Sequence, residues 1–240
     1  MQGWRTRVPL HAIWEKGVLK LSDIWFRILS NARFLLRSRN TMGYGIHSPY
    51  LFYIARAILP ETAPYYCFAE LRERGEAEAR NYGNTELRKD GPTERRTYGT
   101  KERKKNEMLF RLVNLVKAET IVEVGPKGIR TAYLQAPNSK ARVLTDPGEQ
   151  VSSFKIQELG TVDFAVMSAQ DGMKAFEALV AHAGEKSLFV VDDIRESKAH
   201  WKTWQAVEAH PAVTARMDLG QTGLVFFDSH FPKQTFRIRV

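Results

Sequence analysis

From about residue 106 to the end of the chain, short β-branched runs alternate with helical repeats of apolar residues. The runs have the length of strands, and glycines or prolines separate them from the helical segments. Such alternation is typical of βαβ units, in which helices connect the strands of a parallel sheet. The expected strands are Thr120–Val124, Arg142–Thr145, Val162–Met167, Leu188–Val191, Val213–Leu219 and Gly223–Phe227.

Only Gly220, Gln221 and Thr222 separate the last two runs. So tight a connection makes two strands an antiparallel hairpin. The sequence therefore predicts an α/β fold whose sheet is mostly parallel and ends in a C-terminal antiparallel hairpin. Helices are expected around Met108–Val116, over Met173–Val180 with Gly184 as the C-terminal cap, and over Ser197–Ala209.

An amphipathic helix is expected from about residue 11 to 37. Its apolar positions step by three and four and share one face: Trp14, Val18, Leu21, Trp25, Ile28, Ala32 and Leu35. Most amphipathic helices turn such a face toward a core, so packing on the domain or on a second copy, as a homo-oligomer, is the favoured interpretation. A basic helix with tryptophans can also lie on an anionic membrane surface, and that alternative stays open.

Charged residues dominate the stretch from residue 71 to 105, where few apolar residues are available to anchor the chain. A surface loop with one short helix at Glu70–Arg80 is expected there. Before it, the apolar run Tyr50–Leu59 predicts another short helix, which a proline ends.

The length of 240 residues and the hydrophobic content of 43% suffice for one substantial core. The patterns divide the chain into an N-terminal helical extension (1–65), a charged loop or linker (66–105) and an α/β domain (106–240). The single cysteine, Cys67, excludes an intramolecular disulfide and a cysteine-rich metal site, and it fits a reducing compartment. The sequence has no signal-peptide pattern and no apolar run of about 18 to 20 residues, so a cytoplasmic location is expected.

The formal net charge of +9 is concentrated near the N-terminus. Residues 1–40 contain eight Lys or Arg residues against Glu15 and Asp23, which gives +6. Such a segment can contact nucleic acid or an anionic membrane surface. A solvated basic face explains the same composition, and it is the favoured interpretation because charged side chains are mostly exposed.

A turn with two glycines, Gly125 and Gly128, follows the strand expected at 120–124. In parallel sheets, ligands bind beyond the carboxyl ends of the strands, and glycines let the backbone approach them without an intervening Cβ atom. Asp146 ends the next strand, 21 positions after Gly125, and a carboxylate at this spacing can accept hydrogen bonds from ribose hydroxyls. The same acid also begins an Asp-Pro-Gly turn sequence, so both interpretations of Asp146 stay open.

Several segments form a recognisable set of motifs. The most specific ones are Leu188–Ile194, Trp201, His210–Thr214, Gly223–Phe227 and Phe236–Arg239, and weaker ones are Gly45–Pro49, Leu109–Val113 and Glu123–Gly125. Together they resemble a class I S-adenosylmethionine-dependent methyltransferase-like family found mainly in Bacteroidetes, over roughly residues 40 to 240. The resemblance implies a Rossmann-like methyltransferase sheet, S-adenosylmethionine as cofactor and a methyl acceptor that the sequence does not identify.

The resemblance also implies roles for individual residues. Those expected near the cofactor are Glu123, Gly125, Gly128 and Asp146. Asp192 and Asp193, which follow the strand at 188–191, would act as catalytic residues that orient the acceptor nucleophile. Considered on its own, an acid at the end of a parallel strand can equally cap the next helix, here near Ser197.

The cofactor motifs depart from the family pattern at several points. Pro126 and Lys127 occupy a turn that is usually small and polar in the family. Relatives resembling catechol O-methyltransferases bind a divalent cation through an aspartate where Ser168 stands, so no metal ligand is assigned. Fourteen residues (147–160) fill a space where typical members have two helices and a strand, so one sheet edge is expected to be short.

Two hypotheses remain. In the first, the chain is a methyltransferase-like protein that uses S-adenosylmethionine, with catalysis impaired by the altered motifs. In the second, it is a non-catalytic binding or assembly module of the same fold that has lost the cofactor. Fold alone does not choose between them.

Overall fold

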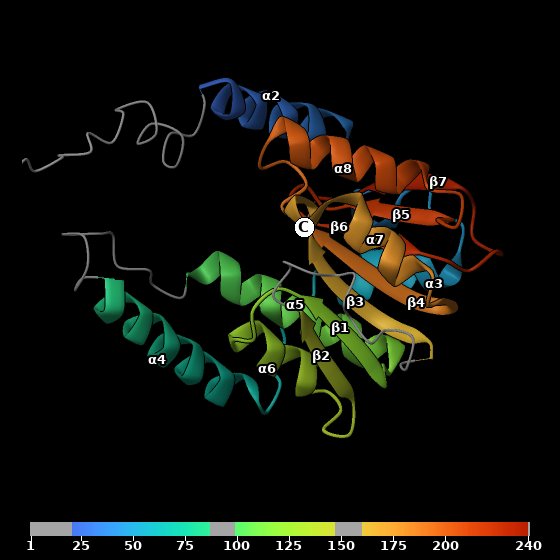
Figure 1. Ribbon diagram of the computed structural model, residues 1–240. Coiled ribbons are helices and arrows are strands. Elements are labelled where there is room, and N and C mark those ends of the chain that lie inside the picture. Colours follow the sequence, from blue (N-terminus) through green and yellow to red (C-terminus); the bar gives the residue numbers. More distant parts are fainter. Residues whose placement is uncertain (1–20, 87–98, 147–159, 240) are drawn as a thin grey trace, which may run out of the picture.

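The computed structural model describes residues 21–86, 99–146 and 160–239 and contains a seven-stranded sheet flanked by helices (Figure 1). The strand order is β2-β1-β3-β4-β6-β5-β7. The strands are β1 (Thr120–Val124), β2 (Arg142–Asp146), β3 (Val162–Ser168), β4 (Ala183–Asp192), β5 (Ala215–Asp218), β6 (Gly223–Phe226) and β7 (Gln234–Arg237). The predicted α/β fold is confirmed.

Strands β2, β1, β3 and β4 are all parallel, whereas β6 is antiparallel to both β4 and β5. The Leu219 amide donates to the Thr222 carbonyl oxygen at 2.9 Å, which closes the expected hairpin between β5 and β6. Strand β7 adds a further edge strand parallel to β5, which the pattern did not predict. Only one of its four side chains is fully buried, so its sequence has little of the alternation that marks a strand.

Successive residues of the central strands point to opposite faces of the sheet, and each face has its own core. On one face, Ile121, Phe164 and Val190 pack with apolar residues of α3 (Pro49–Tyr53), the π-helical turn η2 (Ile54–Ile58) and α5 (Thr100–Val116). On the other face, the alternate residues pack with α7 (Gly172–Val180) and α8 (Lys198–Ala209). The sheet is therefore the middle of three layers (Figure 1).

A smaller third cluster explains why the charged stretch is more helical than expected. Phe68 and Leu71 begin α4 (Phe68–Glu86) and are buried against Phe110 of α5 and Tyr133 of α6 (Ile129–Gln135). The expected short helix is thus nineteen residues long. The rest of the predicted loop, at 87–98, lies outside the described residues.

The C-terminal cap predicted for the helix at Met173–Val180 is wrong. Helix α7 ends at Val180 with Ala181 as its C-terminal cap, and Gly184 belongs to β4. The Gly184 amide donates to Ser187 Oγ at 2.8 Å, so a side chain satisfies the backbone where the strand begins. The first residues of β4 are mostly polar or small, so the apolar pattern predicted the strand only from Leu188 onward.

Helix α2 (Leu21–Arg37) lies alongside α8 (Figure 1) but does not pack through the predicted apolar face. Trp25, Ile28 and Leu35 of that face are exposed, and Phe34 is buried instead. The part of the predicted helix before Leu21 lies outside the described residues. This face is therefore not packed on the domain, where polar contacts and Phe34 hold the helix instead. The other half of the favoured interpretation, packing on a second copy, stays a prediction. Within the described residues, no helix is both long and apolar enough to cross a membrane.

Candidate functional site

The carboxyl ends of the four parallel strands bring most of the predicted site residues to one edge of the sheet. Val124 of β1 is in register with Asp146 of β2, and Ser168 of β3 is in register with Asp192 of β4. The Asp146 backbone ends β2, while its side chain lies outside the described part of the chain, so its ribose contact stays a prediction. The parallel register thus brings these positions to the edge of the sheet where the sequence predicts a crevice.

Glu123 of β1 is fully buried, and two side chains of α6 neutralise and bind it. Arg130 Nε donates to its Oε1 at 2.5 Å, and Thr131 Oγ1 donates to its Oε2 at 2.5 Å. Both carboxylate oxygens are therefore engaged within the protein. Such pairing is what allows a carboxylate to be buried at all.

The turn after β1 has the backbone geometry that requires glycine. Gly125 has a φ of +137°, a region that L-residues rarely adopt. A Cβ atom there would lie 2.9 Å from Nη2 of Arg130, so the guanidinium rests directly against the turn. At Gly128 the backbone is extended, and a Cβ atom would lie 2.9 Å from Oε1 of Glu78 on α4. Side chains of α4 and α6 therefore border the glycine turn.

Asp192 and Asp193 follow each other at the end of β4, yet their surroundings differ. Asp192 is buried, with Oδ1 accepting from Thr222 Oγ1 at 2.9 Å and Oδ2 lying 3.1 Å from Lys105 Nζ. Asp193 is half-buried and adopts a left-handed backbone with φ of +58°. The Asp193 carbonyl oxygen lies 3.0 Å from His200 Nδ1 at the start of α8, whereas Ser197 Oγ caps the same helix by accepting from the His200 amide. Ser197, rather than either aspartate, is thus the N-cap.

Arg130 connects two acidic positions at this edge of the sheet. Its guanidinium binds Glu123 of β1 and lies 3.8 Å from Oδ2 of Asp192 on β4. Burial opposes the charged form, but Glu123, Asp192 and Asp193 together raise the pKa of Arg130 above its ordinary value. The guanidinium is therefore a permanent cation at the centre of the site.

The charges at the strand ends do not cancel. Glu123, Asp192 and Asp193 contribute three negative charges, and Arg130 and Lys105 contribute two positive ones, so these five described side chains sum to one negative charge. S-adenosylmethionine carries a sulfonium, an ammonium and a carboxylate, and so a net positive charge. The glycine turn, which a Cβ atom would fill, and this residual negative charge fit that cofactor. Within the described residues, no group of three His, Cys, Asp or Glu side chains is placed to hold a metal ion.

Comparison with known proteins gives matches only among solved structures. No family model matches the chain, and neither does any curated protein. The structure of cofactor-bound Rv0187 from MTB overlaps 70% of this chain and 99% of its own, with 14% identity and a TM-score of 0.47. The O-methyltransferase TomG from Streptomyces achromogenes, in complex with SAM, overlaps 74% of this chain and 94% of its own, with 10% identity and a TM-score of 0.44. The O-methyltransferase from Bacillus cereus in complex with SAH overlaps 72% and 95%, with 11% identity and a TM-score of 0.40.

Sequence reasoning missed the cations of the site. Lys105 belongs to the basic run at the start of α5, which the charge pattern alone assigns to solvent. Arg130 lies only five residues after Gly125, but nothing in the pattern shows that its side chain turns back over the glycine. A basic residue next to a predicted glycine turn, with acids at the ends of two predicted parallel strands, is the signal that could have found it.

Proposed function

We propose that the protein is methyltransferase-like and binds S-adenosylmethionine at the carboxyl ends of β1 to β4. The observation that carries the proposal is the glycine turn after β1, with Gly125 at a φ of +137°. It follows a buried acid, and the end of the adjacent strand carries Asp146. This arrangement supports the family resemblance of the motifs.

The residues of the crevice have separate roles in this proposal. The backbone at Gly125 and Gly128 would contact the methionine part of the cofactor, and Asp146 would accept hydrogen bonds from the ribose. The cofactor supplies the methyl group as an electrophile. Glu123 and Asp192 are held by neighbouring side chains and would contribute negative charge beside the sulfonium.

Asp193 is the acid best placed to orient an acceptor nucleophile. Within the described residues, no hydrogen bond or ion pair involves its carboxylate, and its side chain is only half-buried. Asp192, by contrast, is engaged by Thr222 and Lys105. Of the predicted catalytic pair, Asp192 would therefore have a structural role and Asp193 would orient the acceptor.

One observation favours the second hypothesis, a binding or assembly module without cofactor. Arg130 already places a cation against Gly125 and between the acids of β1 and β4. In this case the guanidinium has taken over the neutralisation that the sulfonium would otherwise provide. The two hypotheses differ in whether Arg130 can leave the turn.

Isothermal titration with S-adenosylmethionine and S-adenosylhomocysteine, each with and without Mg2+, tests the proposal. We expect the whole chain to bind with micromolar affinity. Gly125→Ala should lose that binding, because the added Cβ atom meets Arg130 and occupies the space beside the glycine turn. Gly172→Ala is the matched control, since Gly172 also has a positive φ but no atom within 4 Å of an added Cβ. It should strain the backbone similarly and keep the binding.

Two outcomes would contradict cofactor binding by the native chain. The absence of both heat and a thermal shift would support the non-catalytic module. Binding by Arg130→Ala but not by the native chain would show in addition that the guanidinium closes the crevice.

A further inference from the structure

Helix α2 presents an unusual number of apolar side chains to solvent. Six large ones are between 39% and 84% exposed: Ile24, Trp25, Ile28, Leu29, Leu35 and Leu36. They fall on one side of the helix, opposite the buried Phe34. A contiguous apolar band of this kind on an exposed surface marks a site of interaction.

The helix is nevertheless fixed to the body of the protein through its opposite side. Arg27 Nη1 lies 2.8 Å from Glu196 Oε1, and Gln221 Nε2 donates to Asn31 Oδ1 at 3.1 Å. Phe34 covers the guanidinium of Arg195, with 4.8 Å from the ring centroid to Cζ. The apolar band therefore faces outward while the helix is held in place.

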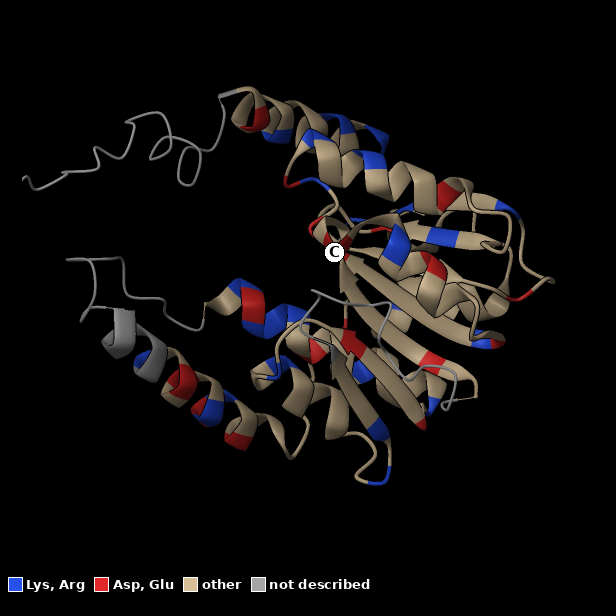
Figure 2. Ribbon diagram, viewed as in Figure 1, with Lys and Arg blue, Asp and Glu red and all other residues tan. Residues whose placement is uncertain are grey.

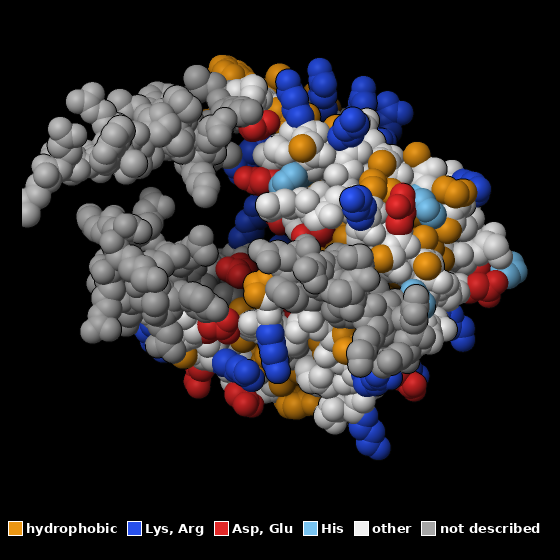
Figure 3. Space-filling model, in the orientation of Figure 1, with side chains coloured by type: hydrophobic (Ala, Val, Ile, Leu, Met, Phe, Trp, Pro, Cys, Tyr) orange, Lys and Arg blue, Asp and Glu red, His pale blue; other side chains and the backbone are white. Residues whose placement is uncertain are grey.

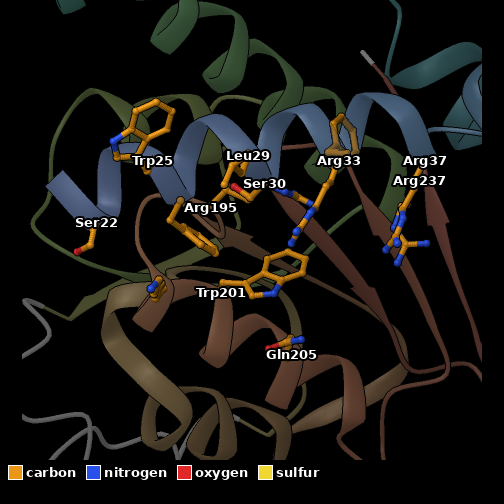
Figure 4. Close-up of a pocket in the computed structure, with 13 residues that line it drawn as sticks. Ser22, Trp25, Leu29, Ser30, Arg33, Arg37, Arg195, Trp201, Gln205 and Arg237 are labelled. Carbon is orange, nitrogen blue, oxygen red and sulfur yellow. The ribbon is translucent and has the colours of Figure 1, made fainter. Parts of the chain in front are cut away.

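A groove of about 550 Å³ runs between α2 and α8, directly beside the apolar band (Figure 4). Trp25 and Leu29 belong to both the band and the groove. The cationic side chains that line it are Arg33, Arg37, Arg195, Lys198 and Arg237. Figure 4 shows Arg33 extending from α2 toward the α8 side of the groove.

Three of these five cations have no acidic partner in the part of the chain that the structure describes. Within the described residues, no ion pair involves Arg33, Arg37 or Lys198. Asp218 is buried and binds Arg195 at 2.6 Å, and its Oδ2 lies 3.9 Å from Nε of Arg237. Asp23 belongs to α2 itself, and Glu196 binds Arg27.

The positive charge is visible on the surface as well. Figure 2 shows Lys and Arg positions along α2 and α8, and Figure 3 shows a row of basic side chains at the edge of the molecule over these helices. Apolar and cationic side chains therefore occupy adjoining strips of one surface.

We propose that α2 and the groove between α2 and α8 form a docking surface for a membrane containing anionic phospholipids. The apolar band would enter the boundary between headgroups and acyl chains, with α2 parallel to the membrane plane. Arg33, Arg37 and Lys198 of the adjoining groove would bind the lipid phosphates. This proposal goes beyond the proposed function and does not depend on it.

The two rival partners fit the surface less well. A nucleic acid would satisfy the cations but would leave the aliphatic side chains of α2 without a partner. A second copy of the chain could cover the apolar band, but a symmetric interface would bring the unpaired arginines of both copies close together. An anionic bilayer complements both strips at once.

Flotation of the full chain with phosphatidylcholine vesicles, with and without phosphatidylglycerol, tests the proposal. We expect association only with the anionic vesicles. The triple variant Arg33→Ser, Arg37→Ser, Lys198→Ser should bind at least about tenfold more weakly, since each basic residue near an anionic surface contributes measurably. Ile28→Ser combined with Leu36→Ser should weaken binding by about tenfold as well, because it removes most of two buried side chains.

Matched controls separate this surface from charge and hydrophobicity in general. Lys140→Ser combined with Lys186→Ser and Lys233→Ser removes three exposed cations elsewhere, and Tyr66→Ser removes an exposed ring. Both controls should retain native association. Equal loss in the control and groove variants would overturn the docking surface.

Two further results would overturn the proposal in favour of a rival partner. A dimer in sedimentation velocity, dissociated by Ile28→Ser with Leu36→Ser and without affinity for vesicles, would assign the band to a second copy. Binding to duplex DNA that depends on Arg33, Arg37 and Lys198, again without vesicle association, would assign the groove to nucleic acid.

Discussion

At the scale of single residues, two arginines organise the carboxyl end of the sheet. Arg130 binds Glu123 and approaches Asp192, and Arg195 binds both carboxylate oxygens of Asp218. Arg195 also lies between the rings of Phe34 and Trp201, at 4.8 and 4.6 Å. These buried carboxylates depend on their cations, because an unpaired buried charge is strongly destabilising.

Replacing Arg130 by Met should lower the free energy of unfolding by about 2 to 3 kcal/mol, because Glu123 would keep only the Thr131 hydroxyl as a partner. Urea denaturation measures the change. In the double variant with Glu123→Gln, the effects should not add, and a coupling of about 1 to 2 kcal/mol is expected. Additive losses would show that the ion pair contributes nothing to stability.

At the scale of elements, the pattern of apolar runs predicted six of the seven strands and the hairpin. Those features depend on neighbours in sequence, such as the alternation around Val122 or the three-residue connection before Gly223. Strand β7 and the full length of α4 depend on distant partners, β5 and Phe110, which no local pattern contains. The local sequence pattern thus predicted which helices and strands exist better than it predicted the residues at which they begin and end.

The contact between β6 and α8 gives a test at this scale. A Cβ atom at Gly223 would collide with the indole ring of Trp204, which is fully buried. Gly223→Ala should therefore destabilise the protein by about 1 to 3 kcal/mol through overpacking. Thermal and urea denaturation would measure this loss.

Trp204→Leu provides the matched control, because it removes the ring atoms that the new methyl group meets. Gly223→Ala should lower the free energy of unfolding much less in the Trp204→Leu background than in the native protein. An equal cost in both backgrounds would mean that the backbone of β6, and not the ring, is the source of the effect.

At the scale of the whole molecule, the site was predictable in outline but not in its charges. The parallel strands expected from the sequence already bring Glu123 and Asp192 to the same edge of the sheet. Their cations come from the N-terminal parts of α5 and α6, and only the folded chain shows that Lys105 and Arg130 point inward. The same holds for α2, whose polar partners Glu196 and Gln221 are far away in sequence.

Phe34 should control whether α2 stays on the domain. Phe34→Ala removes a buried ring that covers Arg195, and a loss of about 3 kcal/mol is expected. Hydrogen exchange should increase over residues 21–37 and stay low in β1, β3 and β4, because α2 has few buried contacts of its own. Leu36→Ala, on the exposed side, should leave exchange unchanged. A uniform increase over the whole chain would show that α2 does not open separately.

The stacking of Arg195 between Phe34 and Trp201 sets the geometry of any encounter with a bilayer. Because one guanidinium contacts α2, α8 and the end of β5, lifting α2 would uncover the side of Arg195 that Phe34 covers. Contact with lipid through α2 would therefore fix the angle between the sheet and the membrane plane. The strand ends would then stand at a constant height above the headgroups.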